Sequence, residues 1–392
     1  MKLKSYFYLS DDLNSNVPDN TYLKIYDIYA DYSGAFFDTD LRIGRQFLFA
    51  GIGRGPIDGL KLSYRGSDNG KLVLYAGTSA PLTDSEKIDS WNESHMFGGE
   101  LTLYYLFGSV AKFSYMRRSK SVDPFELNPP QLGISSVNPT SLQRQAVGID
   151  VTRELNNRMS LYLRADLGVG DGVPDGTLAL ERSELIVTYN HPKSHYITAE
   201  FLSRRPLIYI NSFFSRFSKL LRRSNELSLA LDKSISEEFW YNGKIAVVQY
   251  GAPSYRGKSS RSLRFNTGIS LKGLTAGLTV RNGYGGDWTG IYGGYYGKIT
   301  QSISLRLDGE WSAFSLTSFD LLDDSDESSA FGVRAGGNWK INRHISVDAE
   351  IHTLAQSIEW ANIADFIPFA GNDRELRAFA KVNFWLFKAK GY

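Results

Sequence analysis

The sequence predicts an all-β fold in which residues 1–392 form a single domain. This domain is a transmembrane antiparallel up-and-down β-barrel of about 20 strands, with 18 as the alternative count. Three observations predict it. Apolar and polar residues alternate in segment after segment, charges of both signs recur on the polar positions, and tight turns alternate with long polar connections.

Residues 303–314, reading ISLRLDGEWSAF, show the alternation most clearly. Apolar or small residues occupy the odd positions, whereas Arg306, Asp308 and Glu310 occupy even ones. This period of two is typical of a strand with one apolar face and one polar face. Because the polar face carries three successive charges, we expect it to line a water-filled lumen while the apolar face contacts lipid. The alternative is a soluble, unexported protein whose apolar face forms the core.

The same parity extends along most of the chain. Apolar residues are predicted to face lipid in the segments 147–151, 161–167, 227–231, 274–280 and 345–351. An Arg or Lys turned toward lipid at mid-depth costs about 2 to 4 kcal/mol, so charges should keep to the opposite parity. The predicted lumen-lining residues are Arg42, Lys61, Lys112, Arg164, Asp166, Arg182, Glu184, Glu200, Arg264, Arg281, Arg306, Asp308, Glu310, Arg334, Asp348, Glu350, Arg377 and Lys381.

The connections between predicted strands fall into two length classes. Long polar connections are expected near 83–93, 120–143, 208–225, 251–261, 316–328 and 356–373, with shorter ones near 171–176 and 285–288. Tight turns are expected near 67–70, 108–109, 155–158, 191–194, 234–238, 271–274, 299–302 and 341–344. Short turns on one side and long loops on the other are typical of bacterial outer-membrane barrels, whose short side is periplasmic. Terminal strands are expected at 3–9, 24–32, 41–49, 60–64 and 376–386.

Composition excludes several classes of function. The absence of Cys excludes zinc-thiolate sites and Cys nucleophiles, and it suits passage through an oxidising periplasm. With 44 basic and 42 acidic residues, the net charge of +2 lacks the basic excess of nucleic-acid-binding proteins. The 23 Tyr, 23 Phe and 7 Trp residues suffice for interfacial girdles, while no apolar run approaches the length of a transmembrane helix.

The N-terminal residues, MKLKSYFYLSDD, lack the apolar region of a secretory signal. Because an outer-membrane barrel must be exported, we expect the numbering to begin after a removed signal. Met1 would then be a replacement residue.

Residues 40–64, reading DLRIGRQFLFAGIGRGPIDGLKLSY, combine LRIGRQ, a Gly-rich turn, IDG and a second alternating strand. This segment resembles the early strands of general and alginate-export-type outer-membrane porins of Gram-negative bacteria. The resemblance implies a porin-like barrel that passes small solutes, without naming a solute. By parity Arg42 and Gln46 point inward, whereas Arg45 points outward and requires a bulge or a position at the edge of the wall. Arg42 is expected either to contact solute or to pair with a neighbouring carboxylate.

Residues 211–223 break the period of two and predict a short amphipathic helix within a long loop. We expect this loop to constrict the lumen, to lie on lipopolysaccharide phosphates, or simply to cap the rim of the barrel. Its cationic residues are Arg216, Lys219, Arg222 and Arg223.

Neither a metal site, a cofactor nor an enzymatic activity is predicted. The acidic residues of 319–327 lack EF-hand spacing and indicate a solvated loop, and the glycines of 283–297 form no phosphate-binding motif. His344 and Ser346 lie close in sequence, but no acid that could orient the His is evident nearby. His352, beside Glu350, is expected to be an ordinary lumen residue.

The leading functional prediction is a porin of the Gram-negative outer membrane that passes small hydrophilic solutes or ions by diffusion. Because both charge signs line the wall, we expect weak ion selectivity. Alternatively, the barrel could be a structural sheath around a partner such as a multihaem cytochrome. No C-x-x-C-H haem motif occurs, so any haem would belong to that partner. The expected partners are lipid, lipopolysaccharide, small solutes and a cytochrome or second copy of the chain, with no nucleic acid.

Overall fold

The computed structural model describes residues 1–10, 22–36, 38–80, 87–121, 125–131, 134–137, 142–169, 178–192, 195–205, 223–251, 260–283, 286–315, 328–358 and 371–384. All the regular secondary structure in these ranges is β-strand. Among these residues no helix has the length and apolar character needed to cross a membrane.

Twenty of the described strands belong to one antiparallel sheet, as the sequence predicts, and the alternative count of 18 is wrong. The chain divides into two compact units, Met1–Val187 with Leu202–Arg223 and Thr188–Phe201 with Ser224–Tyr392.

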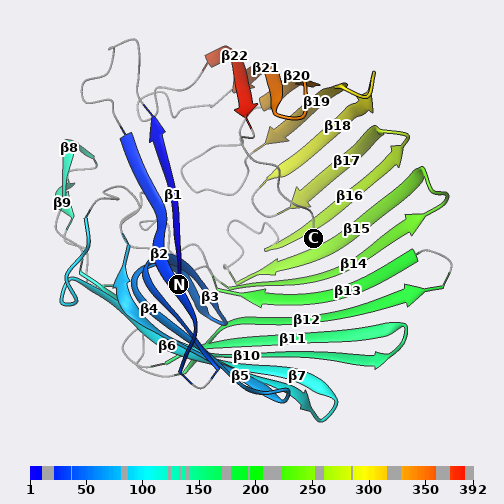
Figure 1. Ribbon diagram of the computed structural model, residues 1–392. Helices are drawn as coiled ribbons and strands as arrows, with labels where there is room; N and C mark the ends of the chain where they lie inside the picture. The colour runs from blue at the N-terminus through cyan, green and yellow to red at the C-terminus, as the bar shows by residue number, and fades with distance from the viewer. Residues whose placement is uncertain are drawn as a thin grey trace. The chain divides into compact units, whose positions relative to one another are not determined.

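The first unit carries the early strands (Figure 1). They are β1 (Lys2–Ser10), β2 (Tyr22–Phe36), β3 (Thr39–Ala50), β4 (Gly53–Ser67), β5 (Gly70–Ser79), β6 (Ser94–Leu106), β7 (Ser109–Lys120), β10 (Leu142–Asn156) and β11 (Met159–Gly168). Strands β12 (Ala179–His191) and β13 (His195–Arg204) contribute residues to both units.

In the second unit each strand pairs antiparallel with the next from β14 to β22 (Figure 1). The strands are β14 (Ser224–Ser234), β15 (Phe239–Tyr250), β16 (Arg261–Leu271), β17 (Leu274–Gly283), β18 (Asp287–Lys298), β19 (Ile303–Ser315), β20 (Ser328–Lys340), β21 (Ile345–Ile358) and β22 (Gly371–Phe384).

The predicted tight turns are confirmed, since each of the eight falls between two consecutive strands. All of the connection predicted at 171–176, and most residues of those predicted at 208–225, 251–261, 316–328 and 356–373, lie outside the described residues. Two differences from the prediction occur in the first unit. The connection predicted at 120–143 contains a separate two-stranded hairpin of β8 (Phe125–Gln131) and β9 (Ile134–Val137), and β4 is much longer than the predicted 60–64. Gly53, Gly55 and Gly59 interrupt the apolar alternation of β4, which hid its first half.

The two faces of the sheet differ as the parity predicts. Leu227 and Leu229 of β14 lie opposite Val247 and Ile245 of β15, and these four side chains are 46% to 63% exposed. In a soluble sandwich such residues would form the core. The other parity in these strands carries Glu226 and Lys244, which lie 3.9 Å apart. We call the face with the charged side chains the polar face.

Candidate functional site

The hairpin formed by β3 and β4 separates from the strands beside it near its turn. Pairing of β3 with β2 ends at Arg45, and pairing of β4 with β5 ends at Ile57. Pairing between β3 and β4 continues to Ala50 and Gly53. Within the described part of the chain, residues 46–56 therefore have strand-register partners only within the hairpin, and Pro56 at its base also accepts a hydrogen bond from the Ala80 N–H. We call residues 46–56 the β3–β4 tip.

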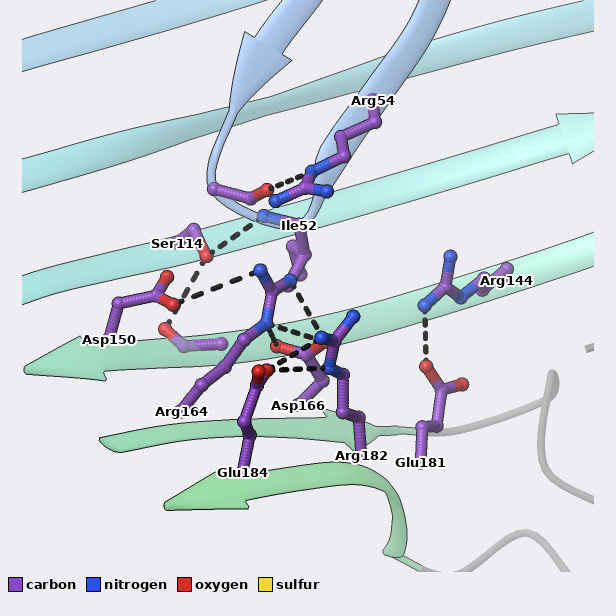
Figure 2. Close-up of polar contacts among 12 residues, drawn as sticks. Ile52, Arg54, Ser114, Arg144, Asp150, Arg164, Asp166, Glu181, Arg182 and Glu184 are labelled. Carbon is purple, nitrogen blue, oxygen red and sulfur yellow. Dashed lines mark hydrogen bonds and ion pairs between the residues drawn. The ribbon is translucent and has the colours of Figure 1, made fainter. Parts of the chain in front are cut away.

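The β3–β4 tip lies on the polar face of β7 and β10 (Figure 2). The backbone N–H of Ile52 donates to Ser114 Oγ at 3.3 Å, and that hydroxyl donates to the Gly148 carbonyl at 3.4 Å. A Cβ at Gly148 would lie 2.5 Å from Ile52 Cγ2, so the absence of a side chain there allows this close approach. Gly51, with φ of +58°, makes the turn.

Apolar packing holds the tip against the wall. Leu48, Ala50 and Ile52 of the tip, with Ile57 at its base, are all buried. Each large aliphatic side chain buried in this way contributes about 1.5 to 3 kcal/mol. The wall side of the same cluster consists of Val73, Tyr75, Met96, Met116 and Ala146. The tip therefore packs firmly against the wall strands. At this place the polar face carries a cluster of apolar side chains, which the tip covers.

The opposite side of the tip is open. Phe47 and Phe49 are exposed, and their ring centroids are 4.7 Å apart.

Arg45 and Asp58 form a buried ion pair where the hairpin leaves the sheet. Arg45 Nε lies 2.6 Å from Asp58 Oδ1, and Arg45 Nη2 lies 2.7 Å from Asp58 Oδ2. The Arg45 Nη2 group also donates to the Lys87 carbonyl at 2.9 Å. Two parallel hydrogen bonds give this pair a fixed geometry. Of the two arrangements expected for Arg45, a bulge or an edge position, the structure has the edge position. The β3–β4 register itself contains no bulge.

The segment that supplies the Lys87 carbonyl is ordered by its own hydrogen bonds. The Ser90 backbone N–H donates to Glu93 Oε2 at 2.9 Å, and the Glu93 N–H donates to the Ser90 carbonyl at 3.1 Å. The hydrogen bond from the Ser90 backbone holds the pKa of Glu93 below its usual value.

A pocket of about 260 Å³ lies between the tip and the wall strands. Its lining combines cations and carboxylates with a few uncharged groups. These residues are Phe49, Gly51, Arg54, Glu100, Val110, Lys112, Asp150, Thr152, Tyr162 and Arg164.

Ion pairs fix the charged side chains beside this pocket (Figure 2). Arg164 Nη2 lies 3.0 Å from Asp166 Oδ2, and Arg164 Nη1 lies 3.8 Å from Asp150 Oδ1. The Tyr162 hydroxyl donates to Asp150 at 2.7 Å. The pocket therefore presents a fixed arrangement of both charge signs to a small solute.

A second set of charges lies on the polar face of the second unit. Asp308 accepts hydrogen bonds from Arg306 at 2.5 Å and from Arg334 at 3.1 Å. Glu350 lies 3.5 Å from Arg334 Nε and also contacts His352. Since Asp308 and Arg334 are register partners on β19 and β20, adjacent strands build this set.

Several other predicted lumen residues also pair with opposite charges. The remaining close pairs are Arg42 with Asp31 at 3.0 Å, Arg182 with Glu184 at 2.6 Å, Glu200 with Lys244 at 3.1 Å, Arg264 with Glu226 at 3.4 Å and Arg377 with Glu375 at 2.6 Å. Arg42 thus makes the carboxylate pair expected as one of its two alternatives, and its contact with solute stays a prediction.

Four other predicted lumen residues have register partners of a different kind. Two lie opposite a like charge, one lies opposite an aromatic side chain, and one lies opposite a carboxylate that accepts hydrogen bonds from other residues. Lys61 lies opposite Arg42, Arg281 opposite Arg264, and Glu310 opposite Tyr292 in the strand registers. Lys381 lies opposite Asp348, whose carboxylate accepts hydrogen bonds from Asn338 and Asn383 at 2.6 Å each. That these side chains line a lumen stays a prediction.

The predicted rim helix at 211–223 is described only at its end. Arg223 Nη2 donates to the Leu180 carbonyl at 2.5 Å. Arg216, Lys219 and Arg222 lie outside the described residues, as does the acidic loop at 319–327.

Sequence reasoning missed parts of this site that local parity could have found. Glu226 and Lys244 share the parity of the predicted lumen residues, so the alternation alone identifies them. In contrast, Ser114 acts through a contact 62 residues away in sequence, and no local pattern indicates that. Arg144, bonded to Glu181 at 2.5 Å, was also missed.

No family model matches the sequence, and no curated protein matches it. Among solved structures, the chain is similar to OccAB4 of Acinetobacter baumannii, with 10% identity, 97% of this chain and 96% of that chain covered, and a TM-score of 0.42. It is also similar to a bacterial polysaccharide outer membrane secretin, with 8% identity, 74% of this chain and 91% of that chain covered, and a TM-score of 0.34. A third similar structure is OmpT, an outer membrane protein of Vibrio cholerae, with 10% identity, 88% of this chain and 98% of that chain covered, and a TM-score of 0.32. The strand pairing described above shows the fold.

Proposed function

We propose that this protein is a non-enzymatic channel of the Gram-negative outer membrane that passes small hydrophilic solutes or ions by diffusion. The observation that carries the proposal is the division of the 20-stranded sheet into an exposed apolar face and a charged polar face. Lipid favours the first face, and water favours the second.

The β3–β4 tip supports a constriction within this channel. It covers part of the polar face of the first unit, and its buried apolar side chains hold it there. A solute passing along that face meets Phe47, Phe49 and the charged pocket beside them. Constriction is one of the three roles expected of the loop at 211–223, most of which lies outside the described residues; we assign this role to the tip.

Charge pairing supports weak ion selectivity. Most of the described cations on the polar face have a carboxylate within 4 Å, so the field of each is largely cancelled nearby. At physiological salt, screening over about 8 Å reduces the remainder.

Planar-bilayer recording tests the proposal. The purified protein, reconstituted between KCl solutions of unequal concentration, should give discrete conductance steps with a reversal potential close to zero. Steps no more frequent than in a protein-free bilayer would contradict an open channel.

The sheath around a multihaem cytochrome remains the alternative function, and the same preparation tests it. A red, haem-staining protein that co-purifies with this chain from native membranes, together with silent bilayers, would favour the sheath.

A further inference from the structure

Three aromatic side chains share the polar face of β18. Tyr292 lies opposite Glu310, and Gly294 lies opposite Asp308, in the register between β18 and β19. Directly opposed residues share a face of the sheet. Asp308 belongs to the charged set of the polar face, so Trp288, Tyr292 and Tyr296 share its parity and lie on that face.

Glycines lie beneath two of these rings, so the rings can lie flat on the backbone of the sheet. A Cβ at Gly277 would lie 2.2 Å from Tyr292 Cζ, and one at Gly268 would lie 2.8 Å from Tyr292 Oη. The Tyr292 ring therefore lies over two adjacent strands where no side chain lifts it. Trp288 similarly lies over Gly290. Tyr292 is 38% exposed and Tyr296 is 58% exposed, so the free sides of these rings are accessible.

This position is unusual for aromatic residues in a membrane-spanning sheet. Their usual place is the lipid face near the membrane interface, where Tyr295 of the same strand lies with 40% exposure. Aromatic rings on a water-facing wall expose apolar area without gaining contact with lipid. A ligand that covers the rings would remove this cost.

The rings follow one another along the strand at four-residue intervals. A strand rises about 3.3 Å per residue, so neighbouring rings are roughly 13 Å apart. This spacing suits an elongated ligand that contacts two or three rings in succession better than a compact one.

The groups around the rings can form hydrogen bonds and carry charges of both signs. Asp308 leans over Gly294, between Tyr292 and Tyr296, with its Oδ1 2.6 Å from the position of a Cβ there. Asn266 donates to Thr279 Oγ1 at 2.8 Å on the adjacent strands. Amides, hydroxyls and carboxylates bond sugar hydroxyls well. Arg306 lies opposite Tyr296, and Arg281 lies opposite Trp288, in the strand registers. Because guanidinium groups and the carboxylates of Asp308 and Glu310 both surround the rings, neither an acidic nor a basic sugar is favoured over a neutral one.

We propose that Trp288, Tyr292 and Tyr296 form a binding track for a neutral oligosaccharide. The weakly positive C–H groups on the face of a sugar ring stack on the negative faces of the aromatic rings. The hydroxyls at the sugar edges bond the neighbouring polar side chains. This inference rests on the proposed channel function and names a solute class for it.

Calorimetry on the detergent-solubilised full chain, titrated with maltohexaose, tests the track without requiring conduction. Binding is expected for the unchanged protein. A Tyr292→Leu, Tyr296→Leu double variant should bind roughly tenfold more weakly. Tyr295→Leu, on the same strand but the opposite face, is the matched control and should bind as the unchanged protein does.

Three results would overturn the track. The first is an absence of maltohexaose binding by the unchanged protein, and the second is equal binding by the double variant. The third is tighter binding of choline than of maltohexaose, which would indicate a site for quaternary ammonium ions. Conductance measured on the same preparations separates the two proposals. Steps without saccharide binding would reject the track alone, whereas saccharide binding in silent bilayers would reject the channel alone.

Discussion

Arg45 and Asp58 face each other across β3 and β4 at the point where the hairpin leaves the sheet, joined by contacts of 2.6 and 2.7 Å. Arg45 is the last residue of β3 that pairs with β2, and Asp58 lies next to the last residue of β4 that pairs with β5. The pair therefore fixes the direction in which the β3–β4 tip departs.

Removing one partner should destabilise the protein and loosen the tip. Asp58→Asn removes the buried carboxylate charge that pairs with Arg45, and the loss of one partner of a buried ion pair costs about 3 to 5 kcal/mol. We expect a lower urea midpoint in lipid vesicles and noisier open-channel current. Arg65→Ala removes an exposed ion pair with Asp40 and should cost about 1 kcal/mol or less. Equal losses from the two variants would contradict an anchoring role for Arg45 and Asp58.

A side chain at Gly148 should displace the tip from the wall. The Cβ of Gly148→Val would meet Ile52 Cγ2 at 2.5 Å, a distance that requires movement. We expect faster protease cleavage within residues 46–56 and a larger conductance. Gly309→Val, whose Cβ would have its nearest atom at 3.9 Å, serves as the control and should leave both unchanged. An unchanged cleavage rate and conductance in Gly148→Val would contradict packing of the tip against the wall.

The assignment of the two faces predicts an asymmetric response to charge. Leu229→Arg places a cation on the exposed apolar face and should cost about 2 to 4 kcal/mol of stability in a bilayer. Asn266→Arg places the same cation at an exposed position of the polar face, where the cost should be much smaller. Urea unfolding in lipid vesicles measures both. A larger loss for Asn266→Arg would reverse the assignment of the faces.

Ion selectivity should respond to the carboxylate that two arginines share. Asp308→Asn leaves the guanidinium groups of Arg306 and Arg334 without that partner, which makes the local wall more positive. The reversal potential in asymmetric KCl should shift toward anion preference, whereas Asp308→Glu keeps the charge and should show no shift. A shift toward cations would exclude Asp308 from the conducting surface.

Strand number and order could be predicted from the sequence because both depend on local patterns. Alternation identifies a strand such as β19 within a dozen residues, and tight turns follow from short polar breaks such as 299–302. The pairing of each strand with the next then follows from the short connections. The β8–β9 hairpin escaped prediction because NPP at 128–130 argues against a strand.

The β3–β4 tip could not be predicted in the same way. Its strands alternate like the rest, and nothing local to Leu48 or Ile52 distinguishes packing on a distant wall from contact with lipid. The partners, Met96, Met116 and Ala146, lie about 40 to 100 residues further along the chain. The outward parity of Arg45 was the one local sign that the hairpin leaves the sheet near that residue.

Single-channel conductance of a tip-shortened protein tests the central claim most directly. Replacing residues 48–55 by an Asn-Gly turn removes Leu48, Phe49 and Ile52 while keeping the Arg45 pair. We predict that the unchanged protein conducts and that the shortened protein, equally folded by circular dichroism, conducts more per channel. Conductance that is absent in both proteins would contradict a water-filled channel, and equal conductance in both would contradict a constriction by the β3–β4 tip.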